Sequence, residues 1–161
     1  MTQIPLGGAI IGAGLEMEVF SPSHYQAMIK VIETSRTSFL KTFKFNPETH
    51  LETIAFLNHY SADESRRVFA VRKLGGVYPL GFATLGSFDI ESKTCSIEAV
   101  FIQEGLEEER IEEKTEFLLL HLAFQNGWEQ VTSEGGNTIV SLTMWPQVEE
   151  TYEKAFGKAL F

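Results

Sequence analysis

Histidine and cysteine, the side chains that most often bind metals or act as nucleophiles, are few and scattered in this sequence. The four histidines, His24, His50, His59 and His121, form no H-x-x-x-H pair, so their spacing predicts no metal site. Cys95 is the single cysteine, which excludes an internal disulfide and a C-x-x-C zinc site. Because no histidine is placed beside it, we interpret Cys95 as a small core residue rather than a nucleophile.

A glycine-rich stretch near the start, residues 8–14, reads G-A-I-I-G-A-G and has the composition of a dinucleotide-binding loop. Such a loop follows a strand and opens a helix, whose N-terminus then meets the pyrophosphate. Here a segment that alternates like a strand, Leu15–Phe20, follows the glycines instead. The order therefore argues against dinucleotide binding, and we expect residues 1–13 to be a flexible lead-in.

Composition and charge fit one globular domain, spanning residues 1–161, with 43% apolar and 22% charged residues. The net charge is −9, which predicts no nucleic-acid partner and no anionic membrane surface but suits an amine or a basic peptide. The longest apolar run, Phe117–Leu120, ends at His121 and is too short to span a bilayer. A single cysteine favours a reducing, cytoplasmic setting.

Helix-start signals and apolar spacing predict four helices. Ser21-Pro22 begins the first, in which apolar residues recur at helical spacing as far as Phe43. Asn46-Pro47 begins the second in the same way. A long third helix is predicted over Glu107–Gln125, and a last one runs from Pro146 to about Ala155.

Strand-like segments alternate with these helices and bear on the fold class. Apart from Leu15–Phe20, they are Val68–Val71, Tyr78–Phe88, Cys95–Ile102 and the β-branched, apolar Thr138–Trp145. The resulting order is β-α-α-β-β-β-α-β-α. It predicts an α/β fold with a mixed, mostly antiparallel sheet flanked by helices on both faces.

Three segments in this order resemble the GNAT superfamily of N-acetyltransferases, and the RimJ/RimL-type branch most of all. They are LEMEVFSPSHYQAMIKVIETSRTSFLKTF, PLGFATLGSFDIESKTCSIEAVFIQEG and YEKAFGK. The resemblance implies a GNAT-like sheet with a splay between the strands Cys95–Ile102 and Thr138–Trp145, where acetyl-CoA inserts. It also implies transfer of an acetyl group to an amine of a protein N-terminus or of a small molecule.

The resemblance places the acetyl-CoA phosphates on the loop and helix start that follow Cys95–Ile102. The family pattern there is Q/R-x-x-G-x-G/A, but the glycine positions fall near Glu108 and Arg110 in this chain. Residues 104–116 include seven glutamates and two basic residues, so the phosphate loop is degenerate. The residues that the resemblance assigns to acetyl-CoA are Ala99, Phe101, Ile102, Arg110, Ile111 and Glu112.

The resemblance also suggests an acid and a base for the transfer. Tyr152, in Y-E-K, matches the tyrosine that protonates the leaving thiolate, and Glu98 lies where the family often carries the base. Ser96 is a further candidate as a hydroxyl that holds a water molecule. A second alignment register instead matches Asn137 and Ser141 to the family's N-x-x-S pair, with one residue too many.

The end of the sequence departs from the family pattern, in which two more strands follow the Y-E-K helix. Here the chain ends at Phe161, so we expect the C-terminal strands to be truncated and the edge of Thr138–Trp145 to need cover. A second copy or a partner chain would supply it. Two functions stay open: an acetyl-CoA-dependent N-acetyltransferase, and a catalytically inactive GNAT-like module for binding or assembly.

Overall fold

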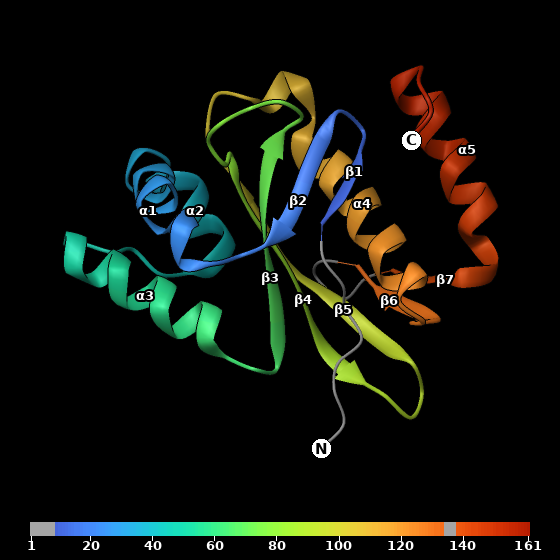
Figure 1. The fold of residues 1–161 in the computed structure, drawn as a ribbon, viewed down its shortest axis with the longest axis horizontal. Coiled ribbons are helices and arrows are strands. Elements are labelled where there is room, and N and C mark those ends of the chain that lie inside the picture. The colour runs from blue at the N-terminus through green and yellow to red at the C-terminus, as the bar shows by residue number, and fades with distance from the viewer. Residues whose placement is uncertain (1–8, 134–137) are drawn as a thin grey trace.

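One twisted sheet runs through the centre of the molecule, as the computed structural model of residues 9–133 and 138–161 shows (Figure 1). Within these residues its strands lie side by side in chain order. They are β1 (Ile10–Gly12), β2 (Leu15–Val19), β3 (Arg66–Lys73), β4 (Gly81–Asp89), β5 (Thr94–Ile102), β6 (Gln130–Thr132) and β7 (Ile139–Ser141).

Helices cover both faces of this sheet, which confirms the α/β fold class and the mixed sheet (Figure 1). One face carries α1 (Tyr25–Thr34), α2 (Arg36–Phe43) and α3 (His50–Ala62). The other carries α4 (Ile111–Gln125) and α5 (Trp145–Phe156). Three short 3₁₀ turns precede helices: η1 (Pro22–His24), η2 (Glu107–Glu109) and η4 (Leu142–Met144).

Each face has its own core. On the side of α1 to α3, aromatic rings from the helices meet rings from β4 and β5: Phe39 stands edge-on to Phe101 at 5.5 Å, and Phe43 stacks on Phe82 at 5.4 Å. On the other side the aliphatic residues of α4 pack against the sheet, with Leu118 fully buried. Burial of this apolar surface is the main force that holds both layers to the sheet.

Neighbouring strands are antiparallel except β5 and β6, which run parallel. Their pairing extends only from Thr94 opposite Gln130 to Ser96 opposite Thr132. Beyond Ser96, β5 continues to Ile102 with no described strand on that side. The two parallel strands therefore separate after a short contact. A splay beside β5 is what the resemblance predicts, but the strand on its other side is β6 and not the expected Thr138–Trp145.

Two predictions about the N-terminal third are wrong. Part of the expected flexible lead-in, Ile10–Gly12, is strand β1, and the Ala13 N–H donates to the Leu160 carbonyl at 2.7 Å. Ile10 is buried, so apolar contacts fix the segment Ile10–Gly12, although its glycine content had suggested a flexible segment. The single helix expected up to Phe43 is divided at Ser35 into α1 and α2. Residues 1–8 lie outside the described part of the chain.

The buried strand predicted over Thr138–Trp145 is also wrong. Only Ile139–Ser141 is extended, as the exposed edge strand β7, and α5 begins at Trp145. The helix predicted from Pro146 is present, and its residues Val148 and Tyr152 pack against the core of α4. Trp145 extends this apolar side by one turn at helical spacing, although the β-branched run before it favoured a strand. The place beside β5 belongs to β6, a short strand for which the sequence carries no clear signal.

Candidate functional site

The turn that follows β5 leads into α4 at the end of the splay. Gly105 has φ +95° and Arg110 has φ +54°, and between them lies the single turn η2. The left-handed conformation of Arg110 delays α4, which begins at Ile111 instead of the predicted Glu107. A cavity of about 240 Å³ opens here, lined by Ser38 of α2 and by the start of α4.

The backbone of this turn can bind an anion. The Gly105 N–H donates to both carboxylate oxygens of Glu107, at 3.2 and 3.1 Å. The N-cap residue of α4, Arg110, makes no side-chain capping hydrogen bond, and the positive end of the helix dipole lies at the same turn. The turn already holds an anionic group, and that group is its own glutamate.

The two basic residues of this region, Arg110 and Lys114, already have partners. Arg110 donates to both oxygens of Glu113, at 3.0 and 2.5 Å, and its guanidinium lies 4.4 Å from the ring centroid of Phe156. The Lys114 ammonium lies 5.4 Å from the same ring. Both cations are therefore drawn towards α5, and a phosphate would have to compete with Glu113 for Arg110.

Glu112 is the carboxylate of this cavity whose charge is least favourable. Its pKa is raised, first by partial desolvation and then by the negative charges of Glu107 and Glu113, while Lys41 opposes the shift. A bound phosphate would add another negative charge to the same cavity. The side chains of this region thus oppose acetyl-CoA, whereas the backbone suits it.

The side chains of the remaining residues assigned to acetyl-CoA are buried in the protein core. Phe101 is 1% exposed and belongs to the aromatic core on the side of α2. Ile102 and Ile111 are buried in the core around α4, and Ala99 is buried opposite Thr84. Of Ala99, Phe101 and Ile102, only backbone groups therefore remain available to a pantetheine arm.

Glu98 occupies a distinctive position on β5. The register steps from Thr84 opposite Ala99 to Leu85 opposite Ile97, so Glu98 is the extra residue of a β-bulge. Its carboxylate accepts from the Ser87 hydroxyl at 3.3 Å and lies 3.6 Å from the Arg66 Nε. Since Arg66 stacks over Tyr60 of α3, Glu98 lies on the face that carries α1 to α3.

Tyr152 lies on the opposite face of the sheet. It is 2% exposed, and its ring packs against Phe117 of α4 at 5.1 Å and against Phe156 at 4.6 Å. Burial raises the pKa of its hydroxyl, so the proton is held more firmly. The structure therefore does not make Tyr152 and Glu98 neighbours, and any shared substrate must reach them from the two sides of the sheet.

The other residues considered from the sequence lie outside the turn after β5. Ser96 is the last β5 residue paired with β6, opposite Thr132. Ser141 ends β7 and lies within 3.1 Å of the Thr143 hydroxyl, while Asn137 is outside the described residues. Cys95 is buried, and desolvation raises the pKa of its thiol to about 12. Within the described ranges no three His, Cys, Asp or Glu side chains gather as a metal site would require.

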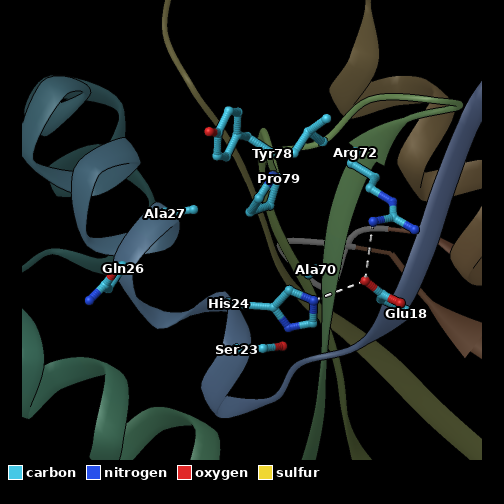
Figure 2. A pocket seen from close by; sticks show the side chains of 10 residues that line it. Glu18, Ser23, His24, Gln26, Ala27, Ala70, Arg72, Tyr78 and Pro79 are labelled. Carbon is cyan, nitrogen blue, oxygen red and sulfur yellow. Dashed lines mark hydrogen bonds and ion pairs between the residues drawn. The ribbon is translucent and has the colours of Figure 1, made fainter.

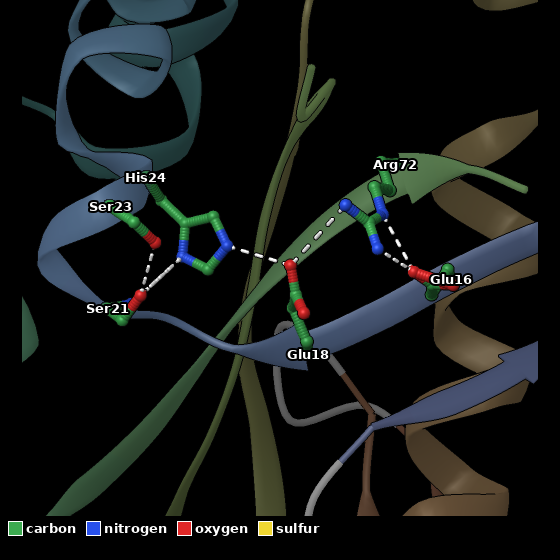
Figure 3. Close-up of polar contacts among 6 residues, drawn as sticks. All are labelled: Glu16, Glu18, Ser21, Ser23, His24 and Arg72. Carbon is green, nitrogen blue, oxygen red and sulfur yellow. Dashed lines mark hydrogen bonds and ion pairs between the residues drawn. The ribbon is translucent and has the colours of Figure 1, made fainter. Parts of the chain in front are cut away.

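A polar cluster that the sequence did not reveal lies where β2 leads into α1 (Figure 3). His24 Nδ1 accepts the Ser21 backbone N–H at 2.9 Å, so its Nε2 carries the proton and donates to Glu18 at 2.9 Å. Arg72 donates to Glu16 at 2.8 Å and has its Nη1 3.7 Å from Glu18. The hydrogen bond from His24, with help from Arg72, lowers the pKa of Glu18. Alternating glutamates before S-P-S-H were the only local signal, because Arg72 is brought in by strand register.

Comparison with solved structures gives a clear match, although no family model and no curated protein matches the sequence. A GNAT-family protein from Chromobacterium violaceum superimposes with a TM-score of 0.70 and 18% identity, covering 96% of this chain and 77% of that one. The chain has the GNAT fold. A GCN5-related N-acetyltransferase from Brucella melitensis matches with a TM-score of 0.66 and 16% identity, over 76% and 57% of the two chains.

Another protein with the GNAT fold is a spermidine N-acetyltransferase from Vibrio cholerae, solved in complex with CoA and spermine. It matches with a TM-score of 0.53 and 13% identity, over 89% of this chain and 80% of that one. The structural superposition establishes the shared fold. At sequence identities this low, it does not assign a functional role to any residue of this chain. Among the helices of the described ranges, none is long and apolar enough to cross a membrane.

Proposed function

We propose that this protein is an N-acetyltransferase of the RimJ/RimL type, which moves an acetyl group from acetyl-CoA to an amine of a protein N-terminus or a small molecule. The observation that supports it best is the early separation of β5 and β6 within a GNAT fold. The gap leads directly to the anion-binding turn at Gly105 and the uncapped N-terminus of α4. Backbone groups there fit a pyrophosphate.

The opposed positions of Glu98 and Tyr152 are compatible with this chemistry. If the thioester of acetyl-CoA lies in the gap between β5 and β6, groups on both faces of the sheet can reach it. In the proposed step, the amine nitrogen bonds to the acetyl carbon and the carbon–sulfur bond breaks. Glu98 takes the proton that the amine loses, and Tyr152 supplies a proton to the thiolate. The raised pKa of Tyr152 suits a group that must arrive protonated.

The charge of the chain favours a cationic acceptor, such as an amine or a basic peptide, because a net charge of −9 attracts cations over long distances. We further propose that a second copy or a partner chain covers the edge strand β7. Ile139 on this strand is 60% exposed, so the edge offers both apolar surface and unpaired backbone groups. Sedimentation analysis of the wild type and of Ile139→Lys, which places a charge on this exposed edge, tests this cover: we expect the variant to lose the association, and a wild type that is a monomer at all concentrations would reject a second copy as the cover.

An inactive binding module remains the second candidate, because the contacts of the turn favour it. The Glu107 carboxylate already accepts the Gly105 N–H, and Glu113 pairs with Arg110 at the wall of the cavity. In such a module these carboxylates form a solvated acidic ridge, and Tyr152 is only a packing residue.

Thermal melting with and without acetyl-CoA separates the two candidates. A ligand at 100 times its dissociation constant adds about 2.7 kcal/mol to stability, a readily measured shift. If acetyl-CoA shifts the melting temperature, Tyr152→Phe should keep that shift and lose about 10²- to 10⁴-fold in turnover. Absence of any shift at millimolar acetyl-CoA rejects the transferase, and unchanged turnover in Tyr152→Phe removes Tyr152 from the mechanism.

A further inference from the structure

A trough runs between α1 and the segment that precedes β4, and one of its walls, Gln103, also borders the cavity at the start of α4 (Figure 2). It consists of two adjoining cavities of about 320 and 520 Å³, which share Gln26, Ala27, Tyr78 and Pro79 as walls. We call it the α1 trough. Nothing in the proposed acetyl transfer uses these walls.

One end of the α1 trough carries an ionised carboxylate with unused hydrogen-bonding capacity. Glu18 Oε1 accepts from His24, while Oε2 receives no hydrogen bond from any residue of the described ranges. The neighbouring Arg72 directs Nε and Nη2 to Glu16, and its Nη1 lies 3.7 Å from Glu18, too far for a hydrogen bond. Because the two carboxylates of Glu16 and Glu18 face this one cation, this end of the trough keeps a net negative charge, and it suits a ligand that donates hydrogen bonds and carries positive charge.

The walls indicate the rest of the ligand. Tyr78 is 74% exposed beside the trough, and an exposed aromatic ring attracts an ammonium group through its electron-rich face. Ala27, Val31 and Pro79 line the larger cavity with apolar surface. Lys30 also lines this cavity and has no ion-pair partner among residues 9–133 and 138–161, so it repels a second positive charge there.

We propose that the α1 trough binds an organic ammonium ion with one positive charge and an apolar body. The ammonium meets Glu18 at the smaller cavity, and the body lies along α1 against Pro79 in the larger one. Lys30 makes the site selective for monoamines over diamines. This binding does not depend on acetyl-CoA, so it stands whether or not the chain is a transferase.

Calorimetric titration of the full chain, without acetyl-CoA, tests the proposal with three probes: 2-phenylethylamine, the uncharged 2-phenylethanol and 1,6-diaminohexane. We expect the monoamine to bind at least about tenfold more tightly than the alcohol, the size expected of one charge-assisted hydrogen bond. It should also bind more tightly than the diamine, and Lys30→Gln should narrow that difference. Equal binding of amine and alcohol, or no binding of the amine, overturns the proposal.

Variants locate the site. Glu18→Gln keeps an oxygen for the His24 N–H, and it should weaken monoamine binding at least about tenfold. Glu91→Gln, which removes an equal charge from the exposed turn between β4 and β5, should bind as the wild type does. If Glu18→Gln melts early, Tyr78→Ala on the exposed wall provides the test and should also weaken binding. Wild-type affinity in both Glu18→Gln and Tyr78→Ala places the amine elsewhere and refutes the proposal.

Discussion

Replacing Glu112 by Gln should strengthen binding of CoA. The substitution keeps the size of the side chain and removes a negative charge from the cavity at the start of α4. In the folded protein this charge is already unfavourable, because partial desolvation and the carboxylates of Glu107 and Glu113 raise the pKa of Glu112. A phosphate in the cavity would meet the same charge.

The expected size of the effect follows from the charges. Two like charges about 7 Å apart repel by about 2 kcal/mol at an effective dielectric constant near 20. Because Glu112 remains accessible to solvent, we halve this to about 1 kcal/mol. That corresponds to an affinity about fivefold higher in Glu112→Gln than in the wild type.

The same reasoning gives the pH dependence. A carboxyl group whose pKa is raised on folding stabilises the fold fully below its ordinary pKa of about 4.3. This contribution is lost as the pH rises through the raised value and the charge forms. Wild-type CoA affinity should therefore increase as the pH falls through the pKa of Glu112. The ratio between Glu112→Gln and the wild type should shrink towards one over the same range.

Calorimetric titration with CoA at pH 7.5 and at pH 5 measures both effects. Glu150→Gln, on the exposed side of α5, is the matched control because it makes the same change in net charge away from the cavity. An equal gain in Glu150→Gln would show a general charge effect, and no gain in Glu112→Gln would refute the placement of the phosphate. Failure of all three proteins to bind CoA would count against the transferase itself.

Three further predictions concern the sheet that frames the splay. Gly81→Ala should destabilise the fold by about 3 kcal/mol or more in denaturant unfolding, because its Cβ would lie 1.8 Å from the Phe101 carbonyl oxygen; wild-type stability would contradict the β4–β5 register. Gly86→Ala would place a Cβ 2.1 Å from Glu98 Oε1, which can move, so stability should change by less than about 1 kcal/mol while turnover falls; unchanged turnover would argue against Glu98 as the base. Cys95, with a pKa of about 12, should resist iodoacetamide at pH 8 until the protein is denatured; rapid labelling of the native protein would contradict its burial.

Local patterns in the sequence were sufficient for most of the central sheet and its helices. Prolines and capping residues mark the region where the first helices begin, and alternation marks β2 and β5. These signals act over a few residues, since a helix start or a strand face depends on near neighbours. The order of elements then limits the fold to very few topologies, of which the GNAT-like sheet is one.

Only the tertiary structure decided the elements around the splay. The three-residue strand β6 pairs with β5, which lies on the other side of α4 in the sequence, and β7 in turn pairs with β6. Such short strands depend on their partners, so their own residues carry little signal. The residues from Leu142 to Trp145 suit a strand locally, but they form η4 and the first residue of α5, whose apolar side packs against α4. In both cases long-range burial outweighs local preference.

The candidate sites show the same division. Sequence resemblance was enough to name Tyr152 and Glu98, yet it could not reveal that the sheet separates them. No sequence motif marks the cluster of Glu18, His24 and Arg72. Arg72 lies on β3, and only the antiparallel register of β3 with β2 places it beside Glu18. Side chains on a strand take their neighbours from the pairing of strands. That pairing is fixed by the burial of the whole sheet and not by any one segment.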